Sequence, residues 1–208
     1  MVGGRRTEIL RASPRMFESA WLDRLSRVHP VLPPVLFAPL IALLFALGQE
    51  GTAATVASFW ILGGYVLWTL TEYWMHRLVF HFEPADGFGA RLHWIIHGVH
   101  HDHPNDPMRL VMPPSVSLPL AAAFYGMFVL ALGIPGGHLV GAGFLAGYLI
   151  YDMTHYHLHH HTTRTRLGRW LYELHMRHHF QDHTRGFGVS APVWDYVFRT
   201  PQLRTSRR

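Results

Sequence analysis

Residues 151–180 read YDMTHYHLHHHTTRTRLGRWLYELHMRHHF, and this stretch holds two groups of regularly spaced histidines. His155 and His159 are four residues apart, so on a helix both side chains lie on one face. The second group has the spacing i, i+3, i+4 and comprises His175, His178 and His179. Imidazole is the commonest metal-binding side chain, and such spacing in two neighbouring segments is typical of metal ligands.

Two further histidine groups precede this stretch. One repeats the HxxHH pattern at residues 97–101, and the other is the pair His76 and His81 in the stretch HRLVFH. A single pair often arises by chance, but four groups between residues 76 and 179 do not. The sequence has no cysteine, which excludes thiolate metal sites and disulfides. The four groups predict a polyhistidine centre with enough nitrogen ligands for two metal ions.

The composition indicates a membrane protein. Of the 208 residues, 49% are hydrophobic and only 15% are charged, which is too apolar for an ordinary small soluble enzyme. The formal net charge is +5, with arginines near both termini and in the histidine-bearing segments, as expected on the cytoplasmic side of a membrane. Nucleic-acid binding is disfavoured because long apolar stretches separate the arginines.

The apolar stretches predict two antiparallel hairpins of membrane-spanning helices. The expected spans are residues 31–48, 52–71, 114–132 and 138–158. The connection at residues 49–51 is very short, and residues 133–137 (GIPGG) form a turn signal. We expect an all-α, integral membrane four-transmembrane-helix bundle with a cytosolic helical cap that holds the polyhistidine dimetal site. Residues 31–208 would then be a single membrane domain with both termini in the cytosol.

Residues 1–30 are polar and basic, and we expect a cytosolic start to the chain. Phe17, Trp21, Leu25 and Val28 recur at helical spacing and predict a short helix in the membrane interface. A disordered tail is the alternative interpretation of this segment.

The remaining segments are expected to build the cap. Residues 72–112 are polar and rich in histidine. The fourth helix has no breaker after Asp152 and should project into the cytosol. Gly168 then allows a turn, residues 169–182 should form a further helix, and the tail from residue 186 should be loop-like.

Four carboxylates lie within a few residues of the histidine groups. Asp152 is the one that we expect to act at the site, as a hydrogen-bond acceptor that orients a ligand imidazole. Glu72, Asp102 and Glu173 are further candidates for this role. The alternative for each of them is a solvated surface carboxylate.

Other histidines fit the groups less well. His157 should not bind metal, because it leaves its helix on the opposite side from the predicted ligands. His93 lies four residues before His97 and extends that helical face, so it is a further candidate.

Six motifs, EYWMHRLVFH, HGVHHDHP, RLVMPP, YDMTHYHLHH, HMRHHF and GFGVSAPVWDYVF, cover about residues 70–200. In these motifs and their order the sequence resembles the fatty acid hydroxylase superfamily, which includes sterol desaturase-like proteins, and within it the fatty acid and sphingolipid 2-hydroxylases. The resemblance implies a di-iron membrane monooxygenase that uses dioxygen to hydroxylate carbon 2 of a fatty acyl chain. Zinc would replace iron in purified protein. The implied metal ligands are His76, His81, His97, His100, His101, His155, His159, His175, His178 and His179.

The resemblance also suggests partners. Eukaryotic members often carry a fused b-type cytochrome, whereas only about 30 residues precede the first expected span here. We therefore expect an external electron donor, either a ferredoxin or a separate b-type cytochrome. The substrate would be a free fatty acid or a ceramide from the bilayer, and the protein would lie in a bacterial inner membrane with its active site on the cytosolic side.

Two other functions compete with this one. A hydroxylase or desaturase of sterols or carotenoids would use the same histidine pattern, although RLVMPP and GFGV favour the 2-hydroxylase branch. A non-catalytic membrane metal-binding protein would have the histidines but no product.

Overall fold

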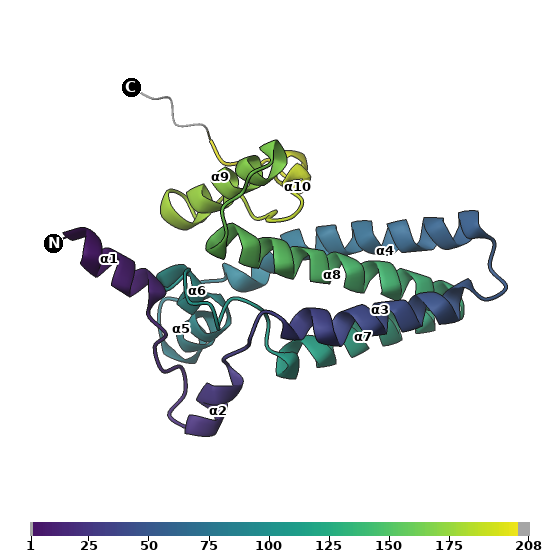
Figure 1. Cartoon of the computed structure of the whole chain (residues 1–208), viewed down its shortest axis with the longest axis horizontal. Helices are drawn as coiled ribbons and strands as arrows, with labels where there is room; N and C mark the ends of the chain where they lie inside the picture. Colours follow the sequence, from purple (N-terminus) through teal and green to yellow (C-terminus); the bar gives the residue numbers. More distant parts are fainter. Residues whose placement is uncertain (1, 204–208) are drawn as a thin grey trace. The chain divides into compact units, whose positions relative to one another are not determined.

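The structure of the protein is a computed structural model that describes residues 2–203, with side chains from residue 5 onward. Met1 and residues 204–208 lie outside the described residues. They are the outer ends of the predicted N-terminal segment (residues 1–30) and of the predicted membrane domain (residues 31–208). All regular elements of the described part are helices, as predicted (Figure 1). They belong to two compact units: unit 1 takes residues 2–12, 70–106 and 154–203, and unit 2 takes residues 13–69 and 107–153.

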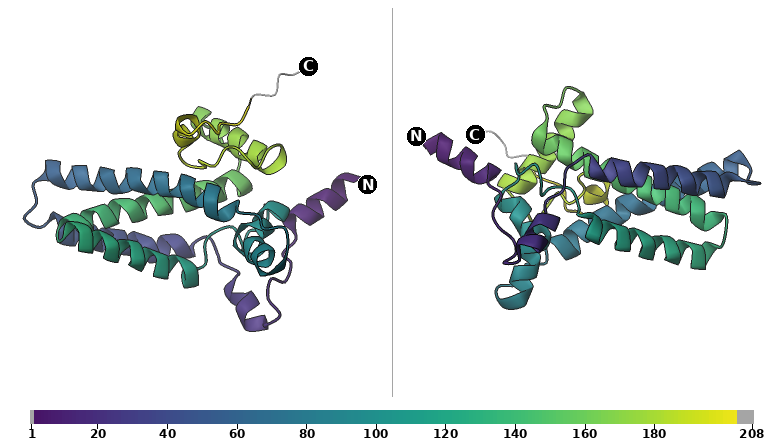
Figure 2. Two further views of the ribbon diagram at one scale, coloured as in Figure 1. Left: turned by 180° about the vertical axis from the view of Figure 1, so that it is seen from behind. Right: turned by 60° about the horizontal axis from the view of Figure 1, so that its bottom comes forward.

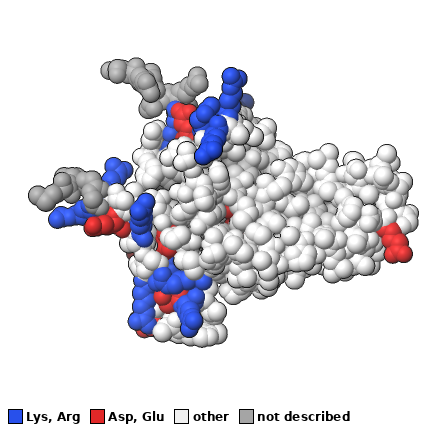
Figure 3. All heavy atoms as spheres, in the orientation of Figure 1, with Lys and Arg blue, Asp and Glu red and all other residues white. Residues whose placement is uncertain are grey.

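Unit 2 contains the apolar helices. It includes α3 (Leu32–Gln49), α7 (Pro114–Leu132) and the N-terminal parts of α4 (Ala54–Met75) and α8 (Gly136–His160). Each predicted span therefore forms a helix close to its expected position. On the face drawn in Figure 3, α3, α4 and α7 show hardly any charged atoms, which is the surface that a lipid environment requires.

Within residues 2–203, three helical segments are long and apolar enough to cross a membrane: Leu32–Gln49, Ala54–Phe80 and Pro114–Leu132. The chain is thus an integral membrane protein. The predicted fourth span is part of α8, which has 25 residues but is not one of the three, since glycines and histidines lower its hydropathy. The count of four spans stays a prediction.

The helix of the second expected span continues beyond Thr71. α4 continues to Met75, and the π-helix η1 (His76–Phe80) follows without a break. Residues 72–75 contain neither glycine nor proline, and a single acidic residue does not end a helix. The first histidine group therefore begins on a helix.

Glycines bring α4 and α8 close together within unit 2 (Figures 1 and 2). A Cβ atom at Gly143 would lie 2.0 Å from the carbonyl oxygen of Ile61, and one at Gly147 would lie 2.7 Å from Cβ of Trp68. The ring of Trp68 meets Phe144 edge-on, with centroids 5.1 Å apart. Small residues at a helix crossing allow this close backbone packing in lipid.

The N-terminal segment is helical in other places than predicted. Val2–Arg11 form α1 in unit 1, and Ala20–Leu25 form α2 in unit 2. Val28 was expected on the interfacial helix but follows it and is buried. Trp21 does lie on α2 and is 69% exposed, so the predicted interfacial helix is shorter than its apolar spacing suggests.

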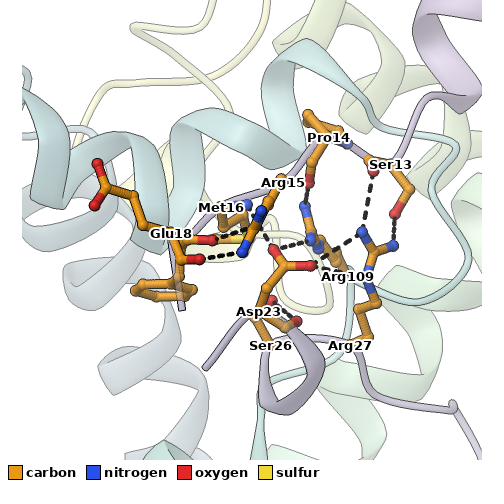
Figure 4. Close-up of polar contacts among 10 residues, drawn as sticks. Ser13, Pro14, Arg15, Met16, Glu18, Asp23, Ser26, Arg27 and Arg109 are labelled. Atoms are coloured by element: carbon orange, nitrogen blue, oxygen red, sulfur yellow. Dashed lines mark hydrogen bonds and ion pairs between the residues drawn. The ribbon is translucent and has the colours of Figure 1, made fainter. Parts of the chain in front are cut away.

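Asp23 on α2 anchors this segment within unit 2 (Figure 4). Its carboxylate accepts a hydrogen bond from the backbone N–H of Met16 at 2.6 Å and pairs with Arg109 at 2.8 Å. Arg27 approaches the same carboxylate at 3.3 Å. Arg109 opens the RLVMPP motif, so this motif ties the N-terminal segment to the chain just before α7.

Unit 1 is built from short helices around the histidines. Its elements are α1, η1, α5 (Gly87–His93), the π-helix η2 (Trp94–Gly98), α6 (Val99–Asp102), α9 (Arg166–Phe180), α10 (Val193–Val197) and the C-terminal ends of α4 and α8. α9 begins before the predicted residue 169 because Thr165 caps it, accepting the N–H of Gly168 at 3.0 Å. The turn expected at Gly168 is thus wrong, and the tail that was expected to be loop-like contains α10.

Candidate metal centre

Five histidines of unit 1 direct their Nε2 atoms at one another, and we call this group site 1. It comprises His76, His81, His97, His101 and His178. The Nε2 atom of His81 lies 3.2 Å from that of His76 and 3.0 Å from that of His178. The Nε2 atom of His97 lies 3.2 Å from that of His76 and 3.0 Å from that of His101.

A second group of five, site 2, also lies within unit 1. It comprises His100, His155, His159, His175 and His179. The Nε2 atom of His155 lies 3.0 Å from that of His100. The Nε2 atom of His175 lies 2.7 Å from that of His159 and 3.1 Å from that of His179. The structure thus brings together all ten histidines that the sequence singles out, five in each site.

The spacing of these nitrogen atoms fits one metal ion in each site. With metal–nitrogen bonds of about 2.0–2.1 Å, two ligands at a right angle are about 2.9 Å apart, and two at the tetrahedral angle about 3.3 Å. The separations of 3.0 Å in site 1 and of 2.7 and 3.0 Å in site 2 are closer to the right-angle value, whereas that of 3.2 Å in site 1 is closer to the tetrahedral value. A metal ion bound in either site would have five histidines as candidate ligands, one more than the four of a closed tetrahedral zinc site.

Burial keeps these imidazoles unprotonated. Burial lowers the pKa of His178 to about 4 and, together with the nearby His178, that of His81 to about 3. Burial also holds the pKa values of His97 and His100 well below the ordinary value. At pH 7 each of these imidazoles is therefore neutral, and one ring nitrogen of each has a lone pair that a metal ion can bind.

Each HxxHH array serves both sites. His97 and His101 belong to site 1, whereas His100, between them, belongs to site 2. α9 repeats this division with the two sites exchanged. Successive residues of a helix are about 100° apart around its axis, so the adjacent histidines of each array reach into different sites.

A π-helix brings the first histidine pair together. His76 and His81 are five residues apart, a spacing that does not place two side chains on one face of an α-helix. In η1 the N–H of His81 donates to the carbonyl oxygen of His76 at 3.1 Å, which is the i→i+5 hydrogen bond of a π-helix. The second π-helix, η2, contains His97.

The other histidines of this region lie outside the two sites. His157 is exposed, and its ring stacks on that of His161 with centroids 5.3 Å apart. It points away from the ligands as its position on the helix predicts. His93, the candidate for extending a ligand face, belongs to neither group.

Backbone carbonyl groups orient two imidazoles of site 1. The Nδ1–H of His76 donates to the carbonyl oxygen of Phe187 at 2.7 Å, and the Nδ1–H of His178 donates to that of Arg185 at 2.8 Å. Both acceptors belong to residues 185–190, which we call the GFGV loop. Sequence reasoning missed this role, although the paired glycines of the motif are a signal for a loop of fixed conformation.

Two of the carboxylates expected to orient imidazoles have other partners. Asp102 accepts a hydrogen bond from Nε1–H of Trp94 at 2.9 Å. Glu173 has a 61% exposed side chain and pairs with Arg177 one helical turn away. The expectation was wrong for both, because a donor nearby in the sequence engages each carboxylate. Glu72 acts on the GFGV loop instead, where it accepts hydrogen bonds from the hydroxyl and the N–H of Ser190.

Asp152 is the most buried of the candidate carboxylates, with 2% of its surface exposed. The hydroxyl of Tyr148 donates to it at 3.4 Å, and the backbone of Met112 supplies a second hydrogen bond. It precedes His155 by three residues on α8. Its role toward an imidazole stays a prediction.

Comparison with known proteins gives matches over most of the chain. The sequence model of the fatty acid hydroxylase family matches residues 61–200. Dihydroceramide fatty acyl 2-hydroxylase FAH2 of Arabidopsis thaliana is 31% identical over 188 residues, which cover 90% of this chain and 79% of that protein. Fatty acid 2-hydroxylase of Homo sapiens is 36% identical over 220 residues, which cover 92% of this chain and 59% of that protein.

A solved structure has the same fold. It is that of full-length Scs7p with only the hydroxylase domain visible, and the match has a TM-score of 0.84 and 33% identity over 89% of this chain and 71% of that one. The residues that match the family model include all ten histidines of the two sites. Because that match covers well over half of the sequence, the chain belongs to the fatty acid hydroxylase family and is one of its enzymes.

Proposed function

We propose that the protein is a dioxygen-dependent lipid hydroxylase that places a hydroxyl group on carbon 2 of a fatty acyl chain. The observation that carries this proposal is the pair of five-histidine sites, in each of which the candidate ligand nitrogen atoms lie within 4.8 Å of one another. Relatives named as a fatty acid 2-hydroxylase and a dihydroceramide fatty acyl 2-hydroxylase support carbon 2 as the position. They also support a free fatty acid or a ceramide as the substrate, taken from the bilayer.

The proposal includes one iron ion in each site, with the five histidines of that site as its ligands. Imidazole suits iron, and a pair of iron ions supplies the means to activate dioxygen. One oxygen atom enters the C–H bond at carbon 2, and the other leaves as water with two electrons and two protons. An external donor, a ferredoxin or a b-type cytochrome, would supply the electrons.

The chain's own residues prepare the ligand set. Burial keeps the imidazoles neutral, and the carbonyl groups of Arg185 and Phe187 hold two of them in one orientation. We assign to Asp152 the corresponding task on α8, because it lies one helical turn before His155 with its carboxylate buried.

We also propose a topology. Residues 31–208 would form one membrane domain with four spans, preceded by residues 1–30, with both termini on the cytosolic side of a bacterial inner membrane. Reporters fused before Val2 and after Arg208 should therefore both read cytosolic when the protein is expressed in a bacterium. Readings on opposite sides would indicate three spans, and a periplasmic reading for both would place the histidines on the wrong side.

Lipid mass spectrometry tests the function. Cells that express the gene under oxygen should contain acyl chains heavier by one oxygen atom, and fragmentation should locate it at carbon 2. Growth under ¹⁸O₂ should label that oxygen, and the same cells without the gene provide the control. Loss of two hydrogens instead, or a change confined to sterols or carotenoids, would contradict the proposal.

A further inference from the structure

One carboxylate outside the two sites organises the GFGV loop. Asp195 on α10 has 2% of its surface exposed. Its Oδ1 accepts the N–H of Phe187 at 2.9 Å and the hydroxyl of Thr200 at 2.9 Å, and its Oδ2 accepts the N–H of Gly188 at 2.8 Å. The two peptide groups that flank Phe187 are thus fixed by the same side chain.

One of these peptide groups joins Asp195 to a histidine of site 1. The N–H of Gly188 and the carbonyl of Phe187 belong to a single peptide group, which donates to Asp195 at one end and accepts from His76 at the other. A carboxylate at the N–H end polarises the peptide group and makes its oxygen a better acceptor. The imidazole of His76 thereby becomes more basic toward a metal ion.

A second peptide group supports His178, and its N–H donates to a backbone carbonyl group. Its carbonyl, from Arg185, accepts from Nδ1–H of His178, and its N–H, from Gly186, donates to the carbonyl oxygen of Thr200 at 2.9 Å. The backbone N–H of Thr200 in turn donates to the carbonyl oxygen of Asp195 at 2.7 Å. Residues 195–200 therefore form hydrogen bonds with both peptide groups whose carbonyl oxygens accept from His76 and His178.

The two glycines of the loop are needed for this arrangement. Gly186 has φ +77°, a conformation that other residues adopt only with strain. A Cβ atom at Gly188 would lie 2.5 Å from the carbonyl oxygen of Ala191. The sequence GFG thus allows the loop to present its carbonyl groups to site 1.

Site 2 differs from site 1 in the hydrogen bonds that the Nδ1 atoms of its histidines make. The Nδ1 atoms of His175 and His179 are buried, and neither has a hydrogen-bond partner among the residues that the structure describes. A ligand imidazole whose second nitrogen is hydrogen-bonded is both oriented and more basic, and loss of such a partner costs about 10–100-fold in metal affinity. His175 and His179 of site 2 therefore lack the support that His76 and His178 have in site 1.

We propose that Asp195 is a positioning residue that acts through the GFGV loop on His76 and His178 and makes site 1 the tighter of the two metal sites. The inference rests on the proposed metal centre but not on the reaction that it catalyses. Asp195→Asn should weaken zinc binding at site 1 by about 10–100-fold, because an amide accepts with one oxygen only and turns its NH₂ group toward a backbone donor.

The experiment uses the full chain, purified in detergent and loaded with zinc. A chelator titration, read by elemental analysis, should remove zinc from the wild type in two steps. Crystals of the half-stripped protein should show anomalous scattering from zinc at site 1 in the wild type and at site 2 in Asp195→Asn. Glu173→Gln, the same chemical change at an exposed carboxylate of unit 1, should behave like the wild type.

Three results would overturn the inference: zinc retained at site 2 in the half-stripped wild type, equal loss from both sites in Asp195→Asn, or no change in that variant. If Asp195→Asn does not fold, Thr200→Val removes one hydrogen bond to Oδ1 and should shift zinc release from site 1 in the same direction by a smaller factor. An unchanged Thr200→Val protein would then count against the role of Asp195. Since the readout is zinc, a protein that passes this test without hydroxylating lipid would contradict only the proposed function.

Discussion

Replacement of His178 by alanine is expected to abolish 2-hydroxylation. The side chain of His178 is fully buried, and its Nε2 atom lies 3.0 Å from that of His81 in site 1. Its loss removes a proposed metal ligand, so the effect should exceed the roughly 100-fold that is the upper end for residues that only orient ligands. The measurement is conversion of a fatty acid or ceramide to its 2-hydroxy product in membranes supplied with reductant and oxygen.

Two variants on α8 serve as comparisons for the loss of activity expected in His178→Ala. His157→Ala should retain nearly full activity, because the side chain is exposed and stacks on His161 away from both sites. Asp152→Asn should fall between the two, with a loss of about 10–100-fold if it orients an imidazole as proposed. A His157 variant as inactive as His178→Ala would show that the helical-face argument is wrong, and a fully active His178 variant would rule out the di-iron hydroxylase.

Replacement of iron by zinc should reduce 2-hydroxylation about as much as His178→Ala does. Protein that contains two zinc ions per chain is expected to be inactive, because zinc does not change its oxidation state. Removal of zinc and anaerobic reloading with ferrous iron should restore 2-hydroxylation in the presence of an electron donor. Zinc is expected in ordinary preparations, since it binds nitrogen ligands more tightly than ferrous iron does.

Elemental analysis accompanies this exchange. Both forms should contain two metal ions per folded chain, so that the comparison concerns the identity of the metal and not its amount. Activity of the zinc form, or a content of one ion or fewer, would contradict the proposed centre. Manganese or cobalt loading offers a further comparison at the same donor set.

Most of the helices and the candidate ligands could be predicted from the sequence. Long apolar stretches and the spacing i, i+3, i+4 are local properties, and they located α3, α7 and the histidines of α8 and α9. The division of the ligands between two sites could not be predicted in this way. It depends on which neighbouring helix each of two adjacent histidines faces, as His100 and His101 show.

The support for site 1 was also beyond local sequence patterns. His76 and Phe187 are 111 residues apart, and the contact is made by a backbone carbonyl that any residue possesses. The sequence analysis considered carboxylates because their side chains can be recognised in the sequence. It therefore predicted that Asp102 and Glu173 orient imidazoles, whereas in the structure they interact with Trp94 and Arg177. Asp195 was overlooked because it acts through peptide groups.

The π-helix η1 has a consequence for how related sequences are aligned. A π-turn accommodates one residue more than the α-helical turn it replaces, so it behaves as a one-residue insertion that a helix absorbs without breaking. If that residue were deleted between His76 and His81, the pair would acquire the four-residue spacing of an ordinary helix and the turn would lose its i→i+5 bond. A related sequence without the extra residue needs a one-residue gap in this turn when it is aligned with the present chain. An alignment that omits the gap would pair His81 with a neighbouring position and would miss one candidate ligand of site 1.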